Sequence, residues 1–76
     1  MTPDQEANMK LSARNQLRGT VRGVTRGPVS AKVELDVSGQ RVVSSITAEA
    51  VEELALSEGD EVIAVIKASD VMLATT

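Results

Sequence analysis

The sequence has 76 residues and contains no cysteine, no histidine and no aromatic side chain. Without cysteine, it can form neither disulfides nor thiolate metal sites. Without histidine, it also lacks the commonest general base and a frequent transition-metal ligand. Its first residues are polar, and no apolar run reaches the about 18 residues that a membrane-spanning helix needs. We therefore expect a cytoplasmic protein with no catalytic residue, no metal ligand, no signal peptide and no membrane span.

The short length predicts one small domain whose core needs additional support. A domain of this size buries only about 60% of the surface of its unfolded chain. The core must be built from Val, Ile, Leu, Met and Ala, because the larger apolar side chains are absent. Small domains without disulfides or metals often gain stability by association. We therefore expect a homo-oligomer.

Positive charge is concentrated in one stretch, although the formal net charge is −3. The basic residues between positions 10 and 33, where there is no acid, are Lys10, Arg14, Arg18, Arg22, Arg26 and Lys32. Such a stretch raises the possibility of nucleic-acid binding, but single-strand binders stack bases on aromatic side chains, and this chain has none. The simpler interpretation is a solvated strand face, and no nucleic-acid partner is expected.

Alternating apolar and polar residues predict strands along most of the chain. The five expected strands are Leu11–Val21, Val29–Val37, Arg41–Ile46, Glu61–Lys67 and Val71–Ala74. In the first of them the alternation places all the basic side chains on the polar face.

Turn and helix signals separate these strands. Arg26–Val29 contains a Gly-Pro turn, Ser38-Gly39 a tight hairpin turn, and Ser57–Asp60 a further turn. Thr47 is the expected N-cap of a short helix that ends near Leu54. The pattern predicts an all-β fold: a small, OB-like five-stranded β-barrel with one short helix.

Several residues could together bind a small oxyanion. Arg14 and Lys67 supply positive charge, Ser12 and the segment SSIT supply hydroxyls, and the helix after Thr47 begins with free N–H groups. A buried dianion requires such pairing and hydrogen bonding. Taken singly, Arg14 and Lys67 are each explained more simply as a charged side chain that extends into water. A Ser–Lys catalytic pair, formed by Ser44 or Ser45 with Lys67, has nothing else to support it.

The chain contains the runs SARNQLRG and VIKASDV, with GPVSAKVEL and VVSSITAEAVEELALSEGDE between them. In these runs it resembles the molybdate-binding Mop family, the molbindins. The resemblance covers nearly everything from Met9 to Ala74 and implies a single Mop domain over residues 9–76, preceded by a flexible extension at residues 1–8. It also implies an OB-like barrel, assembled as a hexamer from dimers with oxyanion sites between subunits.

The resemblance also implies the site residues. They are Ser12, the amide of Ala13, Arg14, Thr47, Lys67 and the amide of Ala68, with Arg14 and Lys67 of one site coming from different chains. Some relatives carry a Ser ligand where this chain has Ala50. A second oxyanion site is implied at the turn Gly27, Pro28 and Val29.

The function expected on these grounds is intracellular binding, storage and homeostasis of molybdate or tungstate, with no other cofactor. Two alternatives are an oxyanion-sensing regulatory or partner-binding module and, on weaker grounds, an OB-type nucleic-acid binder.

Overall fold

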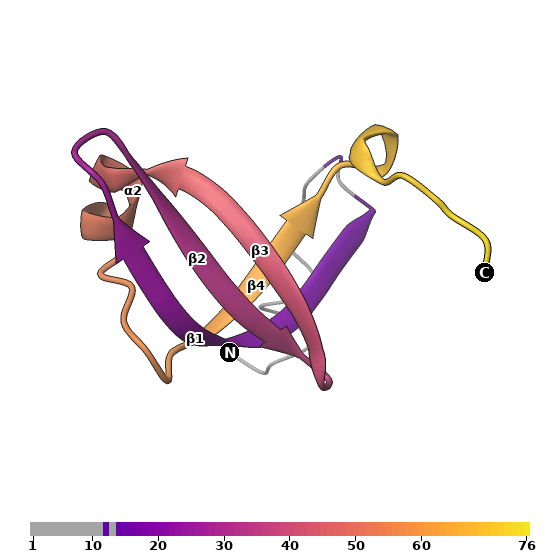
Figure 1. Ribbon diagram of the computed structural model, residues 1–76, viewed down its shortest axis with the longest axis horizontal. Helices are drawn as coiled ribbons and strands as arrows, with labels where there is room; N and C mark the ends of the chain where they lie inside the picture. The colour runs from indigo at the N-terminus through magenta and orange to yellow at the C-terminus, as the bar shows by residue number, and fades with distance from the viewer. Residues whose placement is uncertain (1–11, 13) are drawn as a thin grey trace. The chain divides into compact units, whose positions relative to one another are not determined.

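The structure, a computed structural model, describes Ser12 and residues 14–76. The expected extension at residues 1–8 lies outside the described part. The elements follow in the order β1 (Asn15–Arg26), β2 (Ser30–Val37), β3 (Gln40–Thr47), α2 (Ala48–Glu53), β4 (Glu61–Ile66) and the 3-10 turn η1 (Ala68–Asp70). The four strands form one sheet in the order β3-β2-β1-β4 (Figure 1). The chain divides into two compact units, Gly19–Val62 and the remainder.

The β2–β3 hairpin carries much of the core of the first unit. Its antiparallel register pairs Leu35 with Val42 and Ala31 with Ile46, so these side chains share one face of the sheet. Ser38 and Gly39 both have positive φ, at 50° and 85°, as the tight turn of a twisted hairpin requires. The buried apolar residues of the described chain are Val21, Ala31, Val33, Leu35 and Val51.

Strand β1 contains a β-bulge between Val21 and Gly23, where the register against β2 shifts. Val21 lies opposite Leu35, and after the bulge Arg26 lies opposite Ala31, so Arg26 shares the face that carries the core. The predicted polar face of the first strand therefore does not extend to Arg26, which lies beyond the predicted end at Val21. Arg26 remains exposed because it lies at the end of the strand.

The first strand is shifted relative to the prediction: it begins at Asn15 instead of Leu11, and it continues beyond the bulge to Arg26 instead of ending at Val21. A bulge breaks strict alternation, which is the signal that marked the strand in the sequence.

Helix α2 begins and ends where the sequence predicts. Thr47 is the N-cap, and its Oγ1 accepts a hydrogen bond from Ala50 N at 3.0 Å. Leu54 is the C-cap, and Ala55 follows it with a φ of 51°. Ala55 N donates to Glu52 O, and the next amide donates to Val51 O, which is the Schellman pattern that closes a helix.

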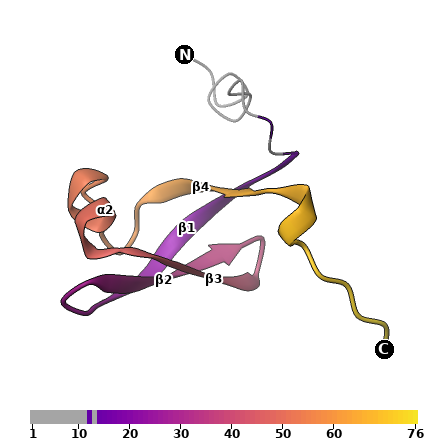
Figure 2. The ribbon, with the colours of Figure 1, turned by 90° about the horizontal axis from the view of Figure 1, so that it is seen from above.

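Helix α2 packs against the end of the hairpin that lies away from the Ser38-Gly39 turn (Figures 1 and 2). Val51 is its fully buried contact residue. The helix start is also joined to the β1–β2 turn, because Ala48 N donates to Val29 O at 2.9 Å.

The C-terminal residues depart from the prediction. The expected strand Val71–Ala74 is wrong: η1 ends at Asp70, and residues 71–76 are irregular and exposed. Met72 and Leu73 are each 93% exposed, because the described chain provides no sheet partner for this apolar segment. The fold class is the expected one, all-β and OB-like with one short helix, and four strands are formed in the described residues.

Candidate oxyanion site

Arg14 and Lys67 flank a long-range hydrogen bond within one chain. Asn15 Nδ2 donates to Ile66 O at 3.2 Å, joining the first residue of β1 to the last residue of β4. Arg14 immediately precedes Asn15, Lys67 immediately follows Ile66, and both cations are exposed. The resemblance implied that the two cations of a site come from different chains, whereas the structure joins their neighbours within the same chain.

Lys67 is held at the start of η1, where it is the N-cap with extended backbone angles. Its carbonyl accepts a hydrogen bond from Asp70 N at 2.8 Å. Ala68 is the first residue of η1, so its N–H has no acceptor within that single turn and can be offered to a ligand. The cation of Lys67 and the amide of Ala68 are therefore presented by one short segment.

Of the residues in the SAR segment, Ser12 and Arg14 are exposed, and Ala13 lies outside the described part of the chain. Ser12 has a hydroxyl that can donate to an anion. Together with Arg14 it places two donors of different kinds immediately before β1.

Thr47 belongs to the other compact unit, at the end of β3. Its Oγ1 accepts from Ala50 N, but a hydroxyl that accepts one bond can still donate its own proton. Thr47 can therefore cap α2 and bind an anion at the same time. Ala50 takes part through its backbone only, and its methyl group offers no donor.

The turn predicted as a second site lies between β1 and β2, and its residues are exposed. Gly27 N donates to Ser30 O at 2.8 Å, and Pro28 has no N–H. The turn therefore offers an anion few backbone donors beyond the N–H of Val29. The hydrogen bond that occupies the Gly27 N–H was not evident from the sequence.

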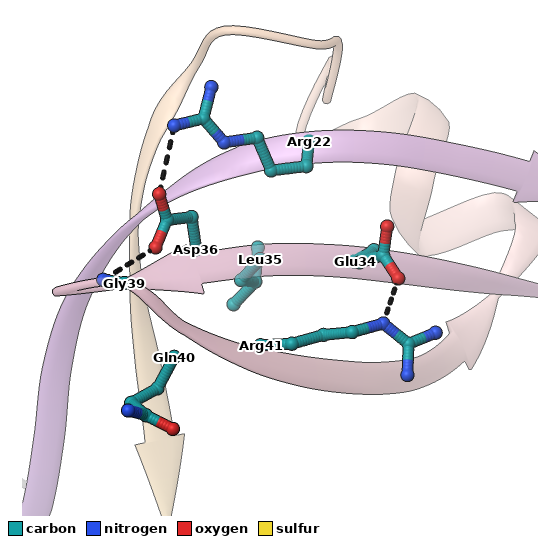
Figure 3. A pocket seen from close by; sticks show the side chains of 7 residues that line it. All are labelled: Arg22, Glu34, Leu35, Asp36, Gly39, Gln40 and Arg41. Atoms are coloured by element: carbon teal, nitrogen blue, oxygen red, sulfur yellow. Dashed lines mark hydrogen bonds and ion pairs between the residues drawn. The ribbon is translucent and has the colours of Figure 1, made fainter.

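The structure also forms a charged depression of about 210 Å³ over β1, β2 and β3, which the sequence analysis did not identify (Figure 3). Arg22 pairs with Asp36 at 2.8 Å, and Arg41 pairs with Glu34. Asp36 also accepts a hydrogen bond from Gly39 N at 2.7 Å, which ties the ion pair to the hairpin turn. Because each cation in the depression faces a carboxylate, we assign the depression a structural role and not an anion-binding one.

These contacts act on the ionisation of Asp36. The hydrogen bond from Arg22, followed by that from the Gly39 amide, lowers the pKa of this carboxyl below its ordinary value of 3.8. A depressed pKa in the folded state stabilises the protein above the unfolded pKa, and this contribution is lost as the pH falls through the folded pKa.

We expect Asp36→Asn to be less stable than the wild type at pH 7, and the difference to shrink as the pH falls below about 4, where the carboxyl of the unfolded chain is protonated. Urea unfolding midpoints at pH 7 and pH 3 measure this. Glu58→Gln, which removes an exposed carboxylate in a turn, is the control. An Asp36→Asn deficit of equal size at both pH values would contradict the assignment.

Among the residues that the structure describes, no three acidic side chains are grouped so that they could hold a metal ion. In the same part of the chain, no helix is long and apolar enough to cross a membrane.

Comparisons with known proteins identify the family of the chain. Residues 11–73 match the TOBE domain. Molybdenum-pterin-binding protein 1 of Clostridium pasteurianum is 47% identical over 66 residues, which cover 86% of this chain and 97% of that protein.

Two solved structures are similar as well. The molybdate binding protein from Sporomusa ovata has a TM-score of 0.85 and 39% identity, covering 88% of this chain and 100% of its own. The cytoplasmic molybdate-binding protein ModG, solved with molybdate bound, has a TM-score of 0.80 and 46% identity, covering 88% of this chain and 48% of its own. The chain therefore belongs to the TOBE domain family and, within it, to the Mop proteins.

Proposed function

We propose that this protein binds molybdate or tungstate reversibly in the cytoplasm, as a storage and homeostasis protein that carries out no catalysis and uses no other cofactor. The observation that carries the proposal is the pair of exposed cations, Arg14 and Lys67, on either side of the Asn15–Ile66 hydrogen bond. Among the described residues, no carboxylate pairs with either cation, in contrast to Arg22 and Arg41. The relatives and solved structures named above support the identity of the anion.

The proposed donor set matches the needs of a tetrahedral dianion. Two fixed cations neutralise its charge, and each charge-assisted hydrogen bond contributes about 1.5–3 kcal/mol. The hydroxyls of Ser12 and Thr47 and the amides of Ala13 and Ala68 supply neutral donors for the remaining oxygens. No member of this set is suited to bond breaking, so binding is the proposed activity.

We further propose that the site forms between subunits of a homo-oligomer, a hexamer built from dimers. The exposed apolar side chains of Met72 and Leu73 support association, because such surface is normally covered. Because the Asn15–Ile66 hydrogen bond joins the neighbours of Arg14 and Lys67 within one chain, we propose that both cations of a site come from one chain and Thr47 from a second.

The turn Gly27, Pro28 and Val29 is proposed as a weaker second oxyanion site. Its main donor is the Val29 amide, supported by the positive charge of Arg26 at the end of β1. With so few donors, its affinity depends on copies of the turn from neighbouring subunits meeting there.

Calorimetric titration of the purified protein with molybdate and with sulfate tests the proposal. We expect molybdate to saturate the protein and sulfate to bind at least about 10-fold more weakly. Donors spaced for the longer metal–oxygen bonds leave sulfate with an unmade charged hydrogen bond, which costs about 1.5–3 kcal/mol. Equal affinities, or a species near the 8.0 kDa chain mass by sedimentation, would contradict the proposed site.

A further inference from the structure

We propose that Asn15 is a positioning residue whose carboxamide fixes the spacing of Arg14 and Lys67 and thereby sets the anion selectivity of the site. This inference rests on the proposed function. Asn15 is not in the predicted ligand set, and its role is to hold the two residues that are.

The geometry gives Asn15 a specific task. Its Nδ2 donates to the carbonyl of Ile66 across 51 positions of sequence, and its side chain is half-buried. The two partners are the first residue of β1 and the last residue of β4. The ends of strands fray readily, so a side-chain bond here reinforces the β1–β4 pairing at the strand ends, where pairing is weakest.

The bond acts directly on the backbone that carries the cations. Lys67 is fixed on both sides, because Asn15 holds the carbonyl before it and Asp70 N holds its own carbonyl. Arg14 is joined to Asn15 by a peptide bond. Besides the pairing of β1 with β4, the Asn15 side chain and the Ile66–Lys67 peptide therefore link the backbone of one cation to that of the other.

Fixed spacing is what allows charged donors to distinguish two anions of the same shape and charge. Rigid donors placed for the larger anion leave gaps around a smaller one, whereas loosened donors can close on either. Loss of the Asn15 bond should therefore weaken molybdate binding more than sulfate binding. A mere loss of folded protein would weaken both by the same factor.

The test compares Asn15→Leu, which keeps the branching at Cγ and removes the donor, with Asn15→Gln, which keeps the carboxamide. Gln40→Leu, at an exposed position on β3, is the control for loss of a carboxamide. If Asn15→Leu fails to fold by circular dichroism, Asn15→Thr replaces it, because a β-branched residue suits a strand and its hydroxyl is shorter than the carboxamide.

We expect Asn15→Leu to weaken molybdate binding about 3- to 10-fold and to change sulfate binding less, so that the affinity ratio falls. Asn15→Gln should recover part of the ratio, and Gln40→Leu should leave it unchanged. Equal losses for both anions, or no loss, would overturn the positioning role alone. Failure of the wild type to bind molybdate would overturn the proposed function and this role with it.

Discussion

Replacing Arg14 or Lys67 by alanine is expected to reduce molybdate affinity by at least about 30-fold. In the proposed site each cation forms a charge pair with the bound molybdate, and alanine removes one partner of that pair. Such truncation costs about 2–5 kcal/mol, because the remaining charge is left uncompensated. Both side chains are exposed in the chain, so the fold should persist. Calorimetry measures the loss, and circular dichroism checks the fold.

The control for this experiment is Arg41→Ala. Arg41 is also an exposed cation, but it faces Glu34 in the charged depression. Its removal should change molybdate affinity by no more than about 3-fold, because Arg41 is already paired with Glu34 and is not in the proposed donor set. If Arg41→Ala weakens binding as much as Arg14→Ala does, general electrostatic attraction, and not a defined site, holds the anion.

The β2–β3 hairpin and helix α2 were predictable because their signals are local. Strict alternation marks both strands, Ser38-Gly39 provides the turn, and Thr47 provides the cap. Each signal acts within a few residues, so the sequence alone shows it.

The bulge in β1 and the C-terminal segment were not predictable in the same way. A one-residue insertion at Val21–Gly23 reverses the faces of the residues that follow, and no local signal beyond a glycine marks it. Residues 71–74 have suitable strand composition, but a strand also needs a partner, and composition does not supply one.

For the site, the sequence predicted Arg14 and Lys67 as ligands but could not place them relative to each other. They lie more than fifty positions apart, and only the Asn15–Ile66 hydrogen bond shows that one chain brings their neighbours together. The ion pairs of Arg22 and Arg41 likewise depend on strand register, which is set by the whole sheet.

The proposed shared site takes both cations from one chain and Thr47 from another, and mixing of inactive variants tests it directly. The variants are Arg14→Ala, Lys67→Ala and Thr47→Asp. Aspartate is a good N-cap, so Thr47→Asp should preserve α2 while its carboxylate repels the anion. Each variant alone should fail to bind molybdate tightly.

Pairs of variants are then mixed under conditions that exchange subunits, with exchange verified by mass spectrometry, and molybdate binding is measured. For Arg14→Ala with Thr47→Asp, random pairing makes about half of the dimers mixed, and one of the two sites in each is complete. About a quarter of the sites should therefore regain binding. For Arg14→Ala with Lys67→Ala, no site receives both cations from one chain, so we expect no recovery. Recovery in the second mixture, or none in the first, would contradict the proposed shared site.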